Sequence, residues 1–544
     1  MPDVLLVQPP IRDFYLTAKR TIPYGLACVA AALISKGFSV EILDGLASAK
    51  SRPLPLPAEL NHLQEFYGRP DASPFALFHR FRHFGFSFEH LARRARECGA
   101  PLIGISALCT PYAGEALAAA AAIKALHPAG TIVMGGHHAT VLPEHLLASP
   151  AVDFVLRGEG EVSLPLLARR LQNGEEVAEV PGIGFRRSDG SLYIRPPAVM
   201  QRLEEYPRPA LELFDIARYR RGGRRSAVIT AGRGCPFACS YCSVGRKSWM
   251  PYRLRPVADV IAEMDAAVNG QGAVFIDFED ENLSLNRAWF LELLGRVCAR
   301  FGGKGLELRA MNGMFPPTLD AEIVEAMHRA GFRTLNLALA ATHPEQLRRF
   351  KRPDVRRDFD RALALAESHG MSAVGYIIVG APHQDPEASV DDLLFLAARR
   401  VLAGVSVYYP APGSADYTLC RDLGLLPGHF GAMRASALPI AHTTRRVDSA
   451  TLLRLGRVVN FMKHLLDRGQ PLPEPARATP AGLDPADRVE TGRRLLARFL
   501  ADGGIRGITP EGEIYDHRIS PNLTRRFLNG LNRIPLRGTT RCSP

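Results

Sequence analysis

Three cysteines stand close together in the segment GRGCPFACSYCSV, directly after an apolar run typical of a β-strand. They are Cys235, Cys239 and Cys242, spaced by four and three residues. Thiolates are soft ligands that suit iron–sulfur clusters or zinc. A structural zinc site normally takes its fourth ligand from a paired motif, and the chain has no second C-x-x-C. We therefore favour a [4Fe–4S] cluster with one iron free of protein ligands over a zinc site or chance clustering.

The chain has nine cysteines in 544 residues, and six of them are scattered. This pattern does not suggest a disulfide framework. Each scattered cysteine is most simply a small buried hydrophobe or an incidental thiol.

The pattern C-x-x-x-C-x-aromatic-C, with Tyr241 as the aromatic residue, resembles the motif of the radical S-adenosylmethionine (SAM) superfamily. The resemblance covers residues 225–415. It implies that the open iron chelates the amino and carboxylate groups of SAM. Reductive cleavage of SAM would then give a 5′-deoxyadenosyl radical that takes hydrogen from an unreactive carbon.

Further segments in this half fit the same resemblance. FIDFEDENLSLN is similar to the second-strand segment, in which Asp280 and Glu281 would face the SAM amino group; a solvated strand-end pair is the alternative. GYIIVGAP is similar to the adenine-binding fifth strand, where Gly375, Ile377 and Gly380 would let the backbone approach the ligand.

The chain also departs from the family's pattern in this half. Ala340 and Ala341 stand where related proteins often carry Glu-Ser, and Gln384 stands where an acidic residue is common. These departures remove expected polar contacts to SAM. They leave three outcomes open: altered SAM positioning, compensation from elsewhere in the chain, or weakened catalysis.

The first 170 residues resemble the cobalamin-binding domain that precedes the barrel in one large radical SAM class. The resemblance rests on VQPP, IPYGLACVAAALISKGFSVEILDG, IGISALCTPY, VMGGHHATVLPEHLL and VDFVLRGEGE, in that order. It implies cobalamin contacts from a loop, a glycine turn and a neighbouring histidine, namely Ser106, Thr110, Gly135, Gly136 and His138. The Asp-x-His-x-x-Gly signature of His-ligated cobalamin proteins is absent. The alternatives are a domain that binds nothing and, for the histidine, an ordinary polar loop residue.

The elements that would position these residues alternate between strand-like and helix-like runs. This rhythm predicts an α/β protein with an N-terminal doubly wound (Rossmann-like) domain, a partial (β/α)6 barrel and a mixed, partly helical C-terminal region. We place these at residues 1–190, 225–415 and 416–544, with a linker at 191–224. Residues 46–100 break the rhythm with a Pro-rich and then Phe- and His-rich stretch, which we interpret as an insertion.

The amino-acid composition indicates the general class of protein. With 47% hydrophobic and 22% charged residues the chain is of ordinary globular type. No apolar run is long enough to cross a bilayer, and the N-terminus lacks a basic n-region, so we expect a cytoplasmic protein. The net charge of +12 is compatible with an anionic substrate or a membrane surface, and no motif indicates nucleic-acid binding.

The resemblance implies a cobalamin-dependent radical SAM enzyme that methylates an unactivated carbon of a small molecule or lipid. A non-methylating radical enzyme that performs cyclisation, ring rearrangement or carbon–carbon bond formation is the alternative, and a non-catalytic cobalamin- or cluster-binding protein is a third. The expected cofactors are a [4Fe–4S] cluster, SAM and cobalamin. The expected partner is a flavodoxin- or ferredoxin-type electron donor, and peripheral membrane contact would go with a lipid substrate.

Overall fold

The first sheet of the protein contains seven strands in the order β10-β9-β8-β7-β6-β1-β3. We describe a computed structural model that covers residues 1–17, 22–245, 248–478 and 482–539. The strands are β1 (Val4–Gln8), β3 (Val40–Asp44), β6 (Leu102–Ser106), β7 (Thr131–Gly135), β8 (Phe154–Leu156), β9 (Ile183–Arg186) and β10 (Leu192–Ile194). The five from β3 to β8 run parallel, and β9 and β10 join antiparallel at one edge.

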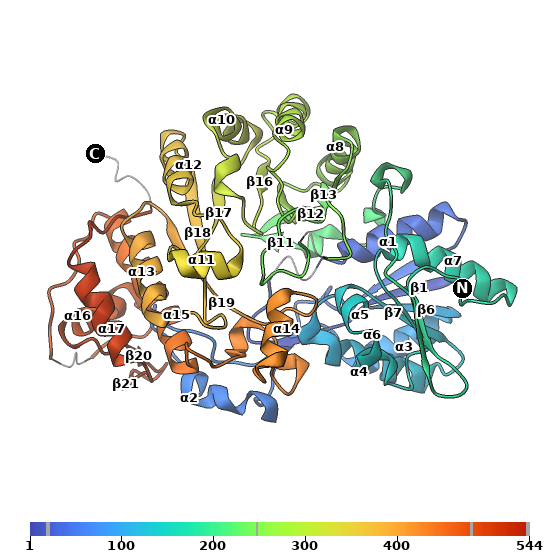
Figure 1. Ribbon diagram of the computed structural model, residues 1–544, viewed down its shortest axis with the longest axis horizontal. Helices are drawn as coiled ribbons and strands as arrows, with labels where there is room; N and C mark the ends of the chain where they lie inside the picture. The colour runs from blue at the N-terminus through green and yellow to red at the C-terminus, as the bar shows by residue number, and fades with distance from the viewer. Residues whose placement is uncertain (18–21, 246–247, 479–481, 540–544) are drawn as a thin grey trace.

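Helices cover both faces of this sheet, as the predicted doubly wound fold requires (Figure 1). α1 (Tyr24–Ser35) and α7 (Gly160–Asn173) share a core with Val4, Leu6 and Val133. α3 (Phe88–Cys98) and α4 (Ala113–Leu126) share the other core with Leu5 and Ile103. The chain leaves β1 for β3 on one side and returns to β6 on the other. The carboxyl ends of β1 and β6 therefore flank a topological switch point, where ligands bind in such sheets.

The segment that departs from the regular alternation of strands and helices is shorter than the predicted insertion at residues 46–100. α3 lies inside that range, yet it packs against α4 and serves as the crossover helix from β3 to β6. The part before α3 forms β4 (Ser51–Pro53), α2 (Gln64–Tyr67) and β5 (Arg82–Phe84). The strand β5 pairs with both β4 and β2 (Ile11–Asp13) in a small sheet.

The shortened insertion packs against the C-terminal region. Figure 1 shows α2 next to the C-terminal elements, and the Phe75 ring contacts the Phe461 ring with centroids 5.7 Å apart. The aromatic residues of this stretch are therefore part of a hydrophobic core, because they pack against the C-terminal region.

Six parallel strands form the second half, which confirms the predicted partial barrel. They are β12 (Arg224–Ile229), β15 (Phe275–Phe278), β16 (Glu307–Arg309), β17 (Thr334–Ala340), β18 (Ser372–Val379) and β19 (Leu402–Val407). Single parallel bridges, Leu308 with Phe332 and Met314 with Leu337, join the first three strands to the last three. The outer helices are α8 (Val257–Asp265), α9 (Arg287–Phe301), α10 (Ala321–Ala330), α12 (Arg356–Ser368) and α13 (Pro386–Ala397).

The C-terminal region is partly helical, as expected. It comprises α14 (Ala415–Asp422), α15 (Arg446–Asp467), α16 (Arg488–Asp502), a hairpin of β20 (Arg506–Ile508) and β21 (Ile514–Asp516), and α17 (Pro521–Leu531). The long α15 packs along β19 and α13, and so extends the wall of the barrel. No helix within the described ranges combines the length and hydropathy that crossing a membrane requires.

The segment between the two sheets is packed rather than extended away from them. β10 closes the edge of the first sheet, β11 (Arg220–Arg221) pairs with β12, and the Ala210 N–H donates to the Ala27 carbonyl at 3.0 Å. We keep the division at 1–190, 191–224, 225–415 and 416–544 as a proposal, although β10, which lies just inside the second range, completes the first sheet.

Candidate active site

A cavity of about 340 Å³ lies between the carboxyl ends of the first sheet and the mouth of the barrel. Gln8, Ser106 and Gly135 line it from the ends of β1, β6 and β7, at the switch point. Thr230 and Glu279 line it from the ends of β12 and β15. The cavity thus gives one ligand access to both halves of the protein.

The deep part of the cavity is an apolar slot over the first sheet. Leu6 and Val133 form its floor, and Val29 of α1 and Leu164 of α7 form its walls. A Cβ atom at Gly104 would lie 2.8 Å from the Leu6 side chain, so only glycine leaves the slot open there. A cavity with this apolar lining at the switch point of the sheet suits part of a large cofactor such as cobalamin.

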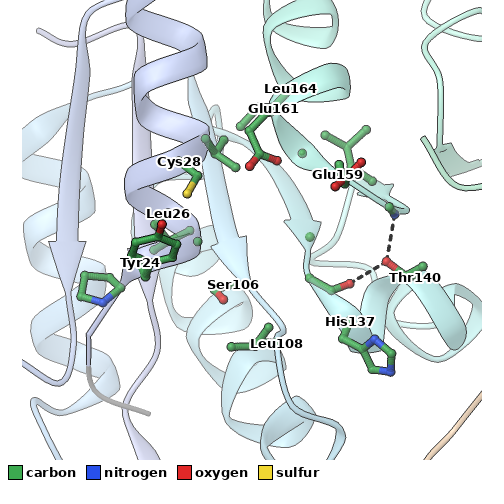
Figure 2. A pocket seen from close by; sticks show the side chains of 18 of the residues that line it. Tyr24, Leu26, Cys28, Ser106, Leu108, His137, Thr140, Glu159, Glu161 and Leu164 are labelled. Atoms are coloured by element: carbon green, nitrogen blue, oxygen red, sulfur yellow. Dashed lines mark hydrogen bonds between the residues drawn. The ribbon is translucent and has the colours of Figure 1, made fainter. Parts of the chain in front are cut away.

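Three predicted cobalamin contacts line this cavity: Ser106, Gly135 and Gly136. Gly136 has a φ of +113°, and a Cβ there would lie 2.9 Å from the Ala107 carbonyl oxygen. The Thr140 hydroxyl donates to the Gly136 carbonyl and accepts from the Gly158 N–H, both at 2.9 Å (Figure 2). The turn is therefore fixed close to the space that the ligand would take.

The other two predicted contacts, Thr110 and His138, lie outside the lining of the cavity. His138 is fully buried, with its Nδ1 3.1 Å from the Thr110 hydroxyl and its Nε2 2.9 Å from His145 Nδ1. Burial lowers the pKa of His138 to about 3. Successive helical residues point about 100° apart, so at the start of α5 (His137–Val141) it is His137, not His138, that contributes to the lining of the cavity.

The three cysteines lie in the loop between β13 (Gly232–Arg233) and β14 (Arg253–Leu254). Asp280 fixes the start of this loop, because its carboxylate accepts the N–H groups of Ala231 at 3.0 Å and Gly232 at 2.6 Å. Burial raises the pKa of Asp280 to about 7, against the effect of these two hydrogen bonds. Asp280 is therefore a positioning residue, and the expectation that it faces SAM does not match its contacts.

The cysteine thiols are close enough to influence one another. Burial raises the pKa of Cys235 to about 11 and also raises that of Cys242, and neighbouring cysteine thiolates add to both shifts. A cluster supplies the positive charge that would relieve this repulsion. Cys239 and Cys242 also line a cavity of about 220 Å³, which leaves room beside their sulfur atoms.

The spacing of the three thiols along the chain suits a cubane cluster. Among the described residues, no three His, Cys, Asp or Glu side chains converge as one metal ion would require. In a cubane each thiolate binds a different iron, so convergence on one point is not needed. Arg352 supports the set, since its Nη1 donates to Cys239 Sγ at 3.9 Å and its Nη2 to the Ala338 carbonyl at 3.1 Å.

Two carboxylates face the cavity at the barrel mouth, Glu279 and Glu281. Burial raises the pKa of Glu281, and the nearby Glu279 adds to the shift. Glu281 lies where the sequence predicted an acidic contact to the SAM amino group. Glu279 was not among the contacts predicted from the sequence, although alternation along β15 places its side chain on the same face as Asp277.

The predicted fifth-strand residues present their backbone, not their side chains, to the barrel interior. A Cβ at Gly375 would lie 2.8 Å from Leu396 of α13 and from Phe359 of α12, so this position faces outward. Ile377 has the same orientation and lies in the outer core. Gly380 ends the strand with a φ of +80°.

The departures from the family pattern also have a structural explanation. Ala340 and Ala341 lie in an apolar cluster that contacts Tyr241 of the cysteine motif. Gln384 accepts the Ala381 N–H at 3.0 Å and donates to the Ile378 carbonyl at 2.7 Å. A carboxylate could not make the second bond, so glutamine at this position closes the loop after β18.

An ion-pair network that the sequence did not reveal joins the two halves beside the cavity. Glu159, which follows β8, bonds to Arg233 at 2.8 Å and to Arg253 at 2.9 Å, and Arg233 also bonds to Glu161 at 2.5 Å. Arg233 stands two residues before Cys235. The only signal in the sequence was its place within the motif, because its acidic partners are more than 70 residues away.

Two family models match the chain. The model described as Radical SAM superfamily matches residues 229–396, and the model described as B12 binding domain matches residues 77–168. The matches include all three cysteines and the turn at Gly135–Gly136.

Relatives match over most of the chain. An uncharacterized methyltransferase of Pyrococcus horikoshii is 24% identical over 77% of this chain and 84% of its own length. The cytidylyl-2-hydroxyethylphosphonate methyltransferase of Streptomyces wedmorensis is 25% identical over 70% of this chain and 73% of its own.

Solved structures share the fold. The radical SAM methyltransferase TsrM from Kitasatospora setae, with cobalamin and a [4Fe-4S] cluster bound, is 20% identical over 78% of this chain and 75% of its own, with a TM-score of 0.59. The cobalamin-dependent SAM radical enzyme OxsB, with aqua-cobalamin and SAM bound, is 14% identical over 92% of this chain and 72% of its own, with a TM-score of 0.64.

Proposed function

We propose that this protein, a radical SAM enzyme with an N-terminal B12-binding domain, transfers a methyl group to an unactivated carbon of a small molecule or lipid. The observation that carries the proposal is the cavity shared by the two halves, which opens from the apolar slot of the first sheet toward the barrel mouth. A methyl carrier held on one side of this space would face a substrate held on the other.

The cofactors would supply the reactive groups. When bound, the cluster would provide the electron that cleaves SAM, and cobalamin would provide the methyl group. Cys235, Cys239 and Cys242 would hold the cluster, and Glu281 would bind the SAM amino group. Ser106, Gly135 and Gly136 would contact cobalamin, with the apolar slot taking its tail.

Residues of the chain would also keep this geometry rigid and dry. Asp280 would hold the loop that carries the cysteines, and the Glu159–Arg233 pair would fix the first sheet against that loop. Glu159 is almost fully buried and Arg233 is three-quarters buried, so the pair is shielded from screening by salt.

We place the enzyme in the cytoplasm with an external flavodoxin- or ferredoxin-type donor. A lipid substrate would add peripheral contact with a membrane surface.

The first test is cobalamin binding. The protein is purified without oxygen, its cluster is reconstituted, and hydroxocobalamin is supplied. We expect about one cobalamin per chain, and transfer of label from methyl-labelled SAM to the substrate carbon. An intact cluster without retained cobalamin would refute the methyl-transfer proposal.

That refuting result would favour a second candidate, a non-methylating radical enzyme. Its support is that anaerobic magnesium-protoporphyrin IX monomethyl ester cyclases are also relatives. The one from Synechocystis is 28% identical over 44% of this chain and 48% of its own. Product analysis distinguishes the two, since only methyl transfer adds a carbon from SAM.

A further inference from the structure

We propose that an acidic one-electron carrier protein docks on the surface formed by α11 (Pro344–Phe350), Lys351 and α14. This docking face consists of Arg348, Lys351, Ala415, Thr418, Leu419 and Leu423. The inference rests on the proposed function, because it requires a cluster that is reduced from outside.

The docking face lies where the cysteines come close to solvent. The cavity of about 220 Å³ beside Cys239 and Cys242 is also lined by Lys351 and Thr418, which are both exposed. Electron transfer slows steeply with distance, so a donor must approach where little protein separates it from the cluster. At this face the exposed Lys351 and Thr418 share a cavity with the partly buried Cys239 and Cys242.

The charge of the docking face is positive. Its neighbouring acidic residues are each bound by an arginine, in the pairs Glu345–Arg349 at 2.7 Å, Asp354–Arg356 at 2.6 Å and Asp422–Arg421 at 3.0 Å. Asp416, which interacts with Lys351, is buried and accepts from the Ser240 hydroxyl at 3.1 Å. Within the described chain Arg348 and Lys351 form no salt bridge, so they are available to a negatively charged partner.

Two leucines are exposed on α14 and at its C-terminal end. Leu419 is 36% exposed and Leu423 is 43% exposed. A small apolar area beside exposed cations suits the weak, short-lived complexes of electron-transfer proteins, which bury less than about 1,200 Å². Complementary charge would raise the rate of encounter, and the apolar area would hold the partner briefly.

The reaction at this face is a single electron transfer. The reduced flavin or iron–sulfur group of the carrier would lose one electron, and the cluster would gain it. No bond forms and no proton moves between the two proteins.

The test uses full-length, cluster-loaded protein and an acidic flavodoxin kept reduced by its NADPH-dependent reductase. The rate of 5′-deoxyadenosine formation is measured against flavodoxin concentration in the wild type and in the double variant Arg348→Glu/Leu423→Gln, and the Kd for flavodoxin is measured separately by surface plasmon resonance. We expect both the KM and the Kd for flavodoxin to rise at least about fivefold in the variant, and to rise with added salt in the wild type. The rate with dithionite, a small reductant, should stay within about twofold of wild type.

A matched double variant on the N-terminal domain, Arg96→Glu/Leu126→Gln, serves as the control. It makes the same charge change on the exposed surface of α3 and α4, where Leu126 is 39% exposed. The control should leave the KM for flavodoxin unchanged.

Three results would overturn the docking face: an unchanged KM in the test variant, an equal rise in the control, or loss of the dithionite-driven rate in the test variant. If the wild type forms no 5′-deoxyadenosine even with dithionite, the proposed function fails first, and the inference falls with it. If dithionite supports the wild type and flavodoxin does not, the docking proposal alone is wrong.

Discussion

Adjacent acidic residues at the end of β15 have different roles. Asp280 uses both carboxylate oxygens on backbone N–H groups of the loop before the cysteines, whereas Glu281 lines the cavity. The carboxylate that was expected to contact SAM at position 280 is thus committed to holding the cysteine loop.

We expect Asp280→Asn to weaken cluster binding. An amide accepts through one oxygen only, and its NH2 group would oppose the second backbone N–H, at a cost of about 1–3 kcal/mol. Iron and sulfide per chain should fall, with a lower Tm. Glu281→Gln is the control, since it should keep the iron content while weakening SAM binding. Full iron content in Asp280→Asn would show that the clamp is dispensable.

Arg352 should tune the reduction potential of the cluster. Its hydrogen bond to Cys239 Sγ and its charge favour the reduced, more negative cluster. Arg352→Gln is expected to lower the midpoint potential by roughly 30–60 mV, equivalent to about 1 kcal/mol for one electron. A redox titration followed by electron paramagnetic resonance measures this. Arg349→Gln, on the exposed side of α11, should leave the potential unchanged, and an unchanged or higher potential in Arg352→Gln would contradict the assignment.

The end of β7 decides how closely a ligand can approach the first sheet. A Cβ at Gly135 would meet only the Leu156 carbonyl oxygen, at 3.9 Å, so a Cβ fits there without strain. At Gly136 the positive φ and the nearby Ala107 backbone would strain any other residue. Gly135 is therefore the position at which the cavity can be filled while the fold is kept.

We expect Gly135→Leu to fold, to load its cluster, and to retain less than about a tenth of the cobalamin bound by the wild type, because the leucine would occupy space that the ring system needs. The absorbance of bound cobalamin after gel filtration gives the stoichiometry. Gly114→Leu on α4, where a Cβ meets nothing within 4 Å, is the control and should bind normally. Equal retention by both variants would place cobalamin elsewhere or nowhere.

Across the whole molecule, His138 links the first sheet to the C-terminal region. Its ring packs against His145 and against Phe430, with centroids 5.1 and 5.4 Å apart. Burial lowers the pKa of His138 to about 3 and also lowers that of His145. The folded protein therefore keeps His138 neutral at pH values where the unfolded chain protonates it.

This difference predicts lower stability in acid. A histidine whose folded pKa lies below its unfolded value of about 6.5 contributes stability that is fully present above that value and lost as pH falls below it. For His138 the loss between pH 7.5 and pH 5 is about 2 kcal/mol. Thermal melting should show a smaller acid-induced fall in Tm for His138→Gln than for the wild type. An equal fall in both proteins would mean that His138 does not carry the effect.

The cofactor chemistry and the order of the domains could be predicted from the sequence alone. The cysteine motif is contiguous, and its spacing within one loop is enough to indicate a cluster. The six barrel strands and the doubly wound domain followed from local alternation of apolar strands and amphipathic helices. Such signals lie within windows of ten to twenty residues, so no distant contact is needed to recognise them.

Which of two neighbouring residues faces the cavity could be established only from the folded structure. Parallel strands buried on both faces are apolar throughout, so the sequence does not reveal which side of β18 carries Gly375 and Ile377. One residue at the start of α5 separates His137 in the cavity from His138 in the core. The acidic residues that pair with Arg233 lie far away in the sequence. The same is true of the C-terminal residues that pack against the shortened insertion. The orientation of these side chains depends on which surfaces meet when the layers pack. Those contacts are made by residues far apart in the sequence, so no local pattern reveals them.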